Sequence, residues 1–344
     1  MEKIKVLIID DSALVRQLLE GMINSHPQME VVGTAADPYF AVEKIKENKP
    51  HVITLDVEMP RMNGLEFLQR LMASHPIPVV MISSWTESNS EIALKALEYG
   101  AVDVVAKPKV GIASGLRELK IQILDKIEAA ARVDVRRLRP LLPTRPAQGE
   151  KSVVMETTAK VIVIGASTGG TRAVTQMVSK LGPATPGMVV VQHMPQGFTK
   201  SFAQSLDRVS TMKVKEAQDG DRILKGHVLV APGDYHTEIA RSGSFYHVRI
   251  HRGPLVNRHR PSVGLAFLSA ARDVGRNAVG IILTGMGDDG ARELGEIRRQ
   301  GGMTIAQDEA SSVVFGMPRR AIELGSAQRV MSLDEITEYL RGLA

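Results

Sequence analysis

Cysteine is absent from the 344 residues, so disulfide bonds and thiolate metal sites are excluded. The sequence also lacks a run of about eighteen apolar residues, the length that a membrane-spanning helix needs. Its first residues enter a strand-like pattern directly, without the short apolar segment of a signal peptide. We therefore expect a cytoplasmic protein that does not insert into a membrane.

Aromatic residues make up only 4% of the chain, and this scarcity bears on nucleic-acid binding, which commonly combines basic clusters with stacking side chains. The basic residues Arg136, Arg137 and Arg139 lie close together, but no aromatic residue separates them. The surrounding residues 132–158 are rich in Arg, Pro, Gln, Thr and Glu and show no sustained periodicity. We interpret this stretch as a solvated linker and expect no nucleic-acid partner.

The length of the chain is typical of two domains, one on each side of the linker. We predict a first domain over residues 1–125, a linker over 126–158 and a second domain over 159–344. Residues 1–125 contain 13 basic and 17 acidic residues, a net charge of −4, whereas the remaining 30 basic and 21 acidic residues give +9. Opposite charges favour docking between the two halves, and the basic half also favours acidic partners.

An apolar run over 161–164 leads into the sequence GASTGG, in which Gly165 and Gly169 flank Ser167. Small neighbours allow a strand to turn sharply into a helix and leave a serine hydroxyl exposed, as in the nucleophile elbow of hydrolases. A dinucleotide-binding fingerprint would instead place a glycine at position 167. The segment is thus open to three interpretations: a hydrolase elbow, a phosphate or nucleotide loop, and a structural turn.

A nucleophilic serine needs a base, and His193 directly follows the strand-like run 188–192 and precedes a loop. The carboxyl end of a neighbouring strand is where open α/β sheets bind their ligands. A third strand-like run, 278–283, leads into TGMGDDG and thereby places Asp288 and Asp289 at another strand end. Such carboxylates orient a histidine, bind a metal or cap a helix.

Four segments, GASTGG, QHMPQGFT, APGDYH and LTGMGDDG, together resemble the catalytic domain of chemotaxis protein-glutamate methylesterases, the CheB family. The resemblance covers nearly the whole chain. It implies that Ser167 is the nucleophile, His193 the general base and Asp289, the second aspartate of the pair, the acid that orients the histidine.

The same resemblance implies an oxyanion hole and identifies one departure from the family. Backbone N–H groups near Thr168 and Met286 are expected to bind the oxyanion, and no cofactor is expected for ester hydrolysis. Gly264, in the sequence HRPSVG, stands where the family leads us to expect an aspartate. We expect this departure to affect a local substrate contact and not the triad.

Carboxylates also follow strand-like runs in the first half of the sequence. The run 3–9 ends in Asp10 and Asp11, and the run 52–55 ends in Asp56. Hard oxygen ligands of this kind suit Mg²⁺, which is normally held by a few carboxylates together with phosphate oxygens and water. In such a site Asp56 would accept a phosphoryl group.

Ser83 and Lys107 follow two further strand-like runs, where a hydroxyl and an ammonium group can bind phosphoryl oxygens. Taken singly, each of these residues is better explained as a helix cap or a solvated side chain. In this order and spacing, however, they resemble a response-regulator receiver domain. The resemblance implies phosphorylation of Asp56 and a Mg²⁺ site made by the three aspartates and the backbone of Glu58. Val104 stands where receivers usually have an aromatic switch residue.

We therefore predict an α/β protein with an N-terminal (βα)5 receiver domain and a C-terminal doubly wound, mostly parallel α/β methylesterase domain. The resemblance implies a serine hydrolase that demethylates glutamate methyl esters on the cytoplasmic helices of chemoreceptors and releases methanol, giving chemotactic adaptation. The resemblance also implies that a chemotaxis histidine kinase is the phosphodonor and that the methyl-accepting chemoreceptors are the substrate. Some family members also deamidate receptor glutamines. The resting receiver is expected to cover the Ser167 site until Asp56 is phosphorylated.

Two other classes of protein remain as alternatives. A phosphorylation-switched regulator without catalysis would explain Asp56 and the linker but would leave Ser167, His193 and Asp289 unexplained. A nucleotide-dependent oxidoreductase would favour glycine at position 167.

Overall fold

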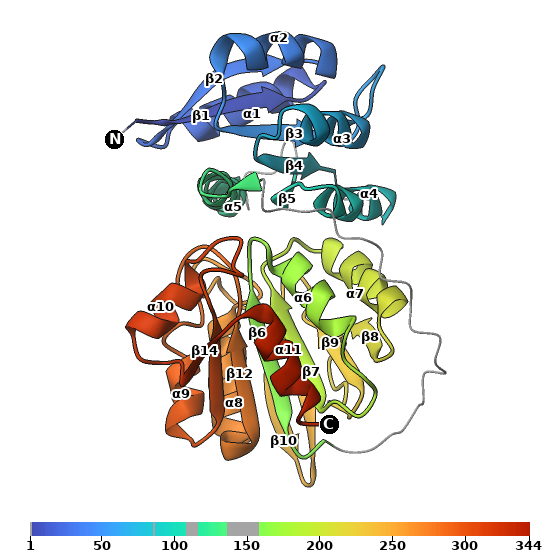
Figure 1. The fold of residues 1–344 in the computed structure, drawn as a ribbon, viewed down its shortest axis with the longest axis vertical. Coiled ribbons are helices and arrows are strands. Elements are labelled where there is room, and N and C mark those ends of the chain that lie inside the picture. Colours follow the sequence, from blue (N-terminus) through green and yellow to red (C-terminus); the bar gives the residue numbers. More distant parts are fainter. Residues whose placement is uncertain (1, 85–86, 108–115, 136–157) are drawn as a thin grey trace. The chain divides into compact units, whose positions relative to one another are not determined.

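A computed structural model describes residues 2–84, 87–107, 116–135 and 158–344 (Figure 1). The chain forms two compact units, Met1–Leu141 and Leu142–Ala344. Most of the predicted linker, including the three clustered arginines, lies outside the described residues. Within the described part of the chain, no helix combines the length and the apolar character that crossing a membrane requires.

The first unit is a five-stranded parallel sheet in the order β2-β1-β3-β4-β5, with helices between successive strands, as predicted. Its central strands are buried along their whole length, because helices cover both faces of a parallel sheet. The elements are β1 (Ile4–Ile9), α1 (Ala13–Asn24), β2 (Met29–Ala35), α2 (Pro38–Asn48), β3 (Val52–Asp56), α3 (Gly64–Ser74), β4 (Val79–Ser83), α4 (Glu87–Glu98), β5 (Asp103–Ala106) and α5 (Leu116–Ala130).

The last helix of this unit extends past the boundary predicted at residue 125. Helix α5 continues to Ala130, and an ion pair of 2.7 Å between Lys126 Nζ and Asp103 Oδ2 ties its second half to β5. Ile127 and Ala130 on the same helix are buried. The charged and alanine-rich end of this helix therefore belongs to the first unit.

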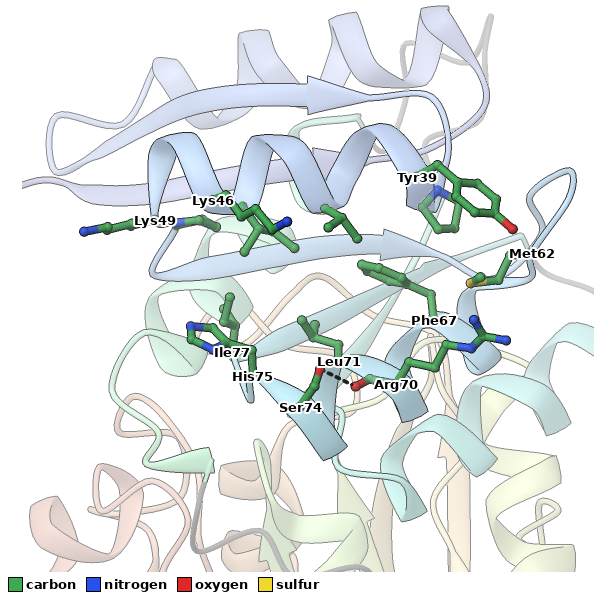
Figure 2. Close-up of a pocket in the computed structure, with 14 residues that line it drawn as sticks. Tyr39, Lys46, Lys49, Met62, Phe67, Arg70, Leu71, Ser74, His75 and Ile77 are labelled. Atoms are coloured by element: carbon green, nitrogen blue, oxygen red, sulfur yellow. Dashed lines mark hydrogen bonds between the residues drawn. The ribbon is translucent and has the colours of Figure 1, made fainter.

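A groove of about 800 Å³ lies between α2 and α3 on the first unit (Figure 2). Phe67 and Leu71 of α3 and Tyr39 of α2 contribute to its apolar lining, and Lys46 and Arg70 add basic groups. None of the residues predicted to bind phosphate or metal lines it. The groove is thus separate from the predicted phosphorylation site.

The second unit has a seven-stranded parallel sheet in the order β14-β13-β12-β6-β7-β9-β8 and a separate antiparallel hairpin, β10-β11. The elements are β6 (Val161–Ala166), α6 (Gly170–Val178), β7 (Gly187–Gln192), α7 (Phe198–Val209), β8 (Lys213–Glu216), β9 (His227–Val230), β10 (His236–Ser242), β11 (Phe245–His251), α8 (Val263–Asp273), the 3-10 helix η2 (Gly275–Asn277), β12 (Ala278–Ile282), α9 (Leu294–Arg299), β13 (Met303–Gln307), α10 (Met317–Glu323), β14 (Arg329–Met331) and α11 (Leu333–Arg341).

The order of the strands creates a topological switch point beside β6. From β6 the chain first adds β7, β8 and β9 on one side and then returns to add β12, β13 and β14 on the other. Figure 1 shows α6 and α11 in front of this sheet and α8 behind it. The unit is therefore doubly wound and mostly parallel, as predicted, and the carboxyl ends of β12, β6 and β7 are the place where such sheets bind ligands.

Candidate active site and phosphorylation site

Ser167 lies in a sharp turn between β6 and α6, and both neighbouring strands hold its backbone. Its N–H donates to the carbonyl oxygen of Thr284 after β12 at 3.0 Å. Its own carbonyl oxygen accepts hydrogen bonds from Gln192 Nε2 at 2.9 Å and from the Gly170 N–H at 2.7 Å. The serine therefore has a fixed position at the centre of the sheet edge.

Two glycines make room for this turn. Gly169 has a φ of +80°, which disfavours other residues, and a Cβ there would lie 2.5 Å from Val313 Cβ. A Cβ at Gly285 would lie 2.7 Å from the Cβ of Ser167. The second glycine of the Gly-x-Ser-x-Gly motif thus meets a steric requirement of the turn. Gly285, in the loop after the neighbouring strand β12, meets another.

His193 continues the strand next to that of Ser167. The register pairs Ala166 with Gln192, and the His193 N–H donates to the Ala166 carbonyl oxygen at 3.0 Å. Ser167 and His193 therefore follow the ends of two adjacent strands. Neighbouring strands in a sheet lie about 4.8 Å apart. Both residues are buried, with 4% and 6% of their surface exposed.

Asp289 comes from the loop after β12 and meets the imidazole of His193. Nε2 of His193 lies 2.9 Å from Asp289 Oδ2, and both side chains are almost fully buried. A carboxylate only accepts hydrogen bonds, so Nε2 of His193 carries a proton and donates to Asp289. The adjacent Asp288 is exposed. The structure thus gives the two aspartates different surroundings.

From the residues that the structure describes, Asp289 accepts five hydrogen bonds, and four of them do not involve the histidine. Oδ1 accepts from Asn257 Nδ2 at 3.1 Å and Ser262 Oγ at 2.9 Å. The first two amides of α8 also donate to the carboxylate, Val263 N–H at 2.7 Å and Gly264 N–H at 3.2 Å. The partly positive N-terminus of a helix favours a negative group at this place.

Burial alone would raise the pKa of Asp289. The hydrogen bond and charge of His193, the nearby charge of His259 and the hydrogen bond from Asn257 outweigh burial, and the pKa lies well below its usual value. Asp289 is therefore ionised at neutral pH and is held in one orientation.

Two histidines near this pair were not predicted from the sequence. His259 stacks on His193 with ring centroids 3.8 Å apart and an interplanar angle of 12°. His236 accepts the Ser262 N–H on Nδ1 at 3.2 Å and donates from Nε2 to the Pro254 carbonyl oxygen at 2.8 Å. Burial is the main cause that lowers the pKa of His236, so this imidazole is neutral. The signal available in the sequence was the presence of these residues in or beside APGDYH and HRPSVG.

The two residues predicted to contribute oxyanion donors lie close to the serine. Thr168 follows Ser167, is buried, and accepts a hydrogen bond on its carbonyl oxygen from Thr284 Oγ1 at 2.9 Å. Met286 is half-buried and follows Gly285, the glycine in contact with Ser167. Their role as oxyanion donors remains a prediction.

Three carboxylates meet at the carboxyl edge of the first unit's sheet. Oxygen atoms of Asp10, Asp11 and Asp56 all lie within 4.8 Å of one another. Lys107 Nζ lies 2.7 Å from Asp56 Oδ2 and 3.2 Å from Asp10 Oδ2, while the Glu58 N–H donates to Asp56 Oδ1 at 3.3 Å. The structure therefore brings together the residues predicted to bind metal and phosphate.

The charge of this cluster is unbalanced and fits a divalent cation. Burial raises the pKa of Asp56 to about 6, the charge of Asp10 adds to this effect, and Lys107 opposes it. Burial also raises the pKa of Asp10. Hard carboxylate oxygens that destabilise one another are suited to Mg²⁺, so the residues present fit the expected ion.

Ser83 and a glycine complete the surroundings of Asp56. Ser83 ends β4 and is buried, and its carbonyl oxygen accepts the Lys107 N–H at 2.8 Å. A Cβ at Gly64 would overlap the carbonyl oxygen of Asp56, so this glycine allows α3 to begin directly beside the aspartate. Val104, the residue at the switch position, is buried in β5.

We expect Asp56→Asn to stabilise the first unit near neutral pH. The folded protein raises the pKa of Asp56 from 3.8 to about 6, so folding favours the protonated carboxyl. The stability linked to this proton is fully present below about pH 4 and is lost as the pH rises through about 6. Without Mg²⁺, asparagine should increase the free energy of unfolding by about 2 kcal/mol near neutral pH.

Differential scanning calorimetry of the full chain measures this effect. The increase should shrink on acidification to about pH 4, where the wild-type carboxyl is protonated in both states. An increase of the same size at both pH values would contradict the electrostatic explanation.

The fold and the two sites define a class of protein, a response regulator whose output unit is a hydrolase of the α/β type. A family model described as response regulator receiver domain matches residues 6–112, and one described as CheB methylesterase matches residues 162–340. The second match covers more than half of the chain. The chain belongs to the CheB methylesterase family.

Curated relatives match this chain over nearly their whole length. A protein-glutamate methylesterase/protein-glutamine glutaminase of Geobacter metallireducens is 52% identical over 99% of both chains. One from Chromohalobacter salexigens is 54% identical over 98% of this chain and 95% of the relative. The crystal structure of the Thermotoga maritima CheB methylesterase catalytic domain is 40% identical, with a TM-score of 0.52, and the match covers 54% of this chain and 98% of that domain.

Proposed function

We propose that this protein hydrolyses glutamate methyl esters on the cytoplasmic helices of chemoreceptors, and that phosphorylation of Asp56 raises its activity. The observation that carries the proposal is the buried His193–Asp289 pair at the strand end next to Ser167. The names of its relatives, protein-glutamate methylesterases, supply the substrate. The reaction takes place in the cytoplasm, where those receptor helices lie.

In the first step, Ser167 Oγ attacks the carbonyl carbon of the ester, and its proton passes to Nδ1 of His193. Asp289 keeps the proton of the imidazole on Nε2 and stabilises the imidazolium that forms. The negative charge develops on the former carbonyl oxygen. Backbone N–H groups near Thr168 and Met286 bind this oxyanion, and each such donor contributes about 3 to 4 kcal/mol.

Collapse of the tetrahedral intermediate breaks the bond to the methoxy group, and His193 returns its proton so that methanol leaves. Water then attacks the acyl-enzyme, His193 accepts a proton from the water, and collapse restores the Ser167 hydroxyl and releases the glutamate side chain. A glutamine side chain reacts by the same route with ammonia as the leaving group. Because the relatives' names include protein-glutamine glutaminase, we include deamidation in the proposal.

The first unit acts as the receiver domain, and a linker connects it to the methylesterase domain, which we place at residues 159–344. A carboxylate oxygen of Asp56 accepts the phosphoryl group from the phosphohistidine of a chemotaxis kinase. Asp10, Asp11, Asp56 and the backbone of Glu58 would hold Mg²⁺, which neutralises phosphoryl oxygens when bound. Lys107 and Ser83 contact the remaining phosphoryl oxygens.

Methanol release from methylated receptor membranes tests the control by phosphorylation. We expect release by the full-length protein to increase when Mg²⁺ and a small-molecule phosphodonor are added, and Asp56→Asn to keep measurable release without this response. No release under any condition, with Asp56 demonstrably phosphorylated, would instead support a regulator that acts by binding alone.

A further inference from the structure

We propose that Glu293 is a positioning residue for the His193–Asp289 pair: it supplies, from the start of α9, the carboxylate that the family leads us to expect at position 264. The proposal rests on the proposed function, since it assigns Glu293 to the same reaction. It adds a residue that sequence analysis did not identify and explains the departure at Gly264.

The geometry around Gly264 places two carboxylates against one point. A Cβ at Gly264 would lie 3.2 Å from Asp289 Oδ1 and also 3.2 Å from Cδ and Oε2 of Glu293. Glu293 is the N-cap residue of α9 and is half-buried. Its carboxylate thus occupies the space that the missing side chain of residue 264 leaves beside Asp289.

This arrangement places both carboxylates at the N-terminus of α8. The Gly264 N–H, in the first turn of α8, donates to Asp289 Oδ1, and the helix dipole favours negative charge there. An aspartate side chain at position 264 would enter the space that the Glu293 carboxylate occupies. A carboxylate at this point can therefore belong either to residue 264 on α8 or to residue 293 on α9.

The charges near Glu293 come from its own segment and from the catalytic pair. Burial raises the pKa of Glu293, with smaller contributions from Asp289 and Asp288, while Arg292 opposes them. Helix α8 carries its charged residues at its far end, and β12 and β13, which also pack against α9, have none. Beyond Asp289 lie the imidazoles of His193 and His259.

A second negative charge behind Asp289 stabilises the protonated form of His193. This charge therefore favours transfer of the serine proton to His193 in the transition state. Glu293→Gln keeps the shape of the side chain and removes the charge. We expect the acidic limb of the pH dependence of kcat/KM to move to lower pH by about half a pH unit.

The experiment measures methanol release by the full-length, phosphodonor-activated protein as a function of pH. The matched control is Glu296→Gln, one turn further along α9, where the charge is paired with Arg299. This control should keep the wild-type profile. A second pair of variants tests the exchange of carboxylates: Gly264→Asp should reduce activity by itself and should restore the wild-type profile when combined with Glu293→Ala.

Two results would overturn the proposal. One is a profile of Glu293→Gln that coincides with that of the wild type, and the other is an equal loss from Gly264→Asp with and without Glu293→Ala. In either case, loss of turnover in Ser167→Ala would leave the proposed hydrolase standing. Full turnover in Ser167→Ala would overturn the hydrolase itself.

Discussion

Replacement of Ser167 by alanine is expected to reduce methanol release by at least about 10⁴-fold. The change removes only the attacking hydroxyl oxygen, and no other group in the triad can form the acyl-enzyme. Release of methanol from methylated receptor membranes measures the effect directly. The residual rate would come from binding and the oxyanion donors, which still stabilise attack by water.

The fold should tolerate this substitution, because hydrogen bonds from the backbone of Ser167 hold the turn in place. Its N–H and carbonyl oxygen bind Thr284, Gly170 and Gln192 whatever side chain is present. Unchanged thermal unfolding and unchanged phosphorylation of Asp56 would show that the variant is intact. Wild-type release from such a protein would refute the triad.

Asp289→Asn should cause a loss of similar size, about 10⁴-fold in kcat, for a different reason. The amide removes the negative charge that stabilises the imidazolium, and its NH₂ group favours the opposite tautomer of His193. The NH₂ group of the asparagine would face the five groups that donate hydrogen bonds to Asp289. The substitution also removes a negative charge from the N-terminus of α8. We therefore expect a loss of about 1 to 3 kcal/mol in the free energy of unfolding as well.

Asp288→Asn is the matched control, since Asp288 is the exposed neighbour in the same loop. It should keep kcat and stability close to those of the wild type. Methanol release and chemical unfolding of both variants distinguish the two aspartates. Equal effects of the two substitutions would mean that the charge of the loop, and not the contact with His193, determines activity.

The sequence predicted the strand ends that carry chemistry, because a parallel sheet gathers the carboxyl ends of its strands along one edge. Ser167 and His193 directly follow strands, so local pattern alone indicated these two positions. The pattern also placed a pair of aspartates after β12, but the choice of Asp289 over Asp288 came from the resemblance to the family. The same reasoning placed Asp10, Asp56 and the other receiver residues at one edge.

The surroundings of Asp289 could not be predicted in this way. Asn257 and His259 lie in a segment without periodicity, and their contacts depend on the path that this segment takes between β11 and α8. Ser262 has the signature of a helix cap, which gives no indication of its bond to Asp289. Nothing in the sequence around Glu293 indicates that its side chain is half-buried beside Gly264. These contacts exist only after the sheet and α8 have packed.

The five donors around Asp289 have a consequence for the reaction coordinate. A carboxylate in water must reorient its solvent when a neighbouring imidazole becomes charged, and this reorganisation is part of the barrier. Here amides of α8 and the side chains of Asn257 and Ser262 hold the carboxylate before substrate arrives. The electric field that stabilises the imidazolium of His193 in the transition state is therefore already present in the resting enzyme. Folding alone places the donors that orient Asp289.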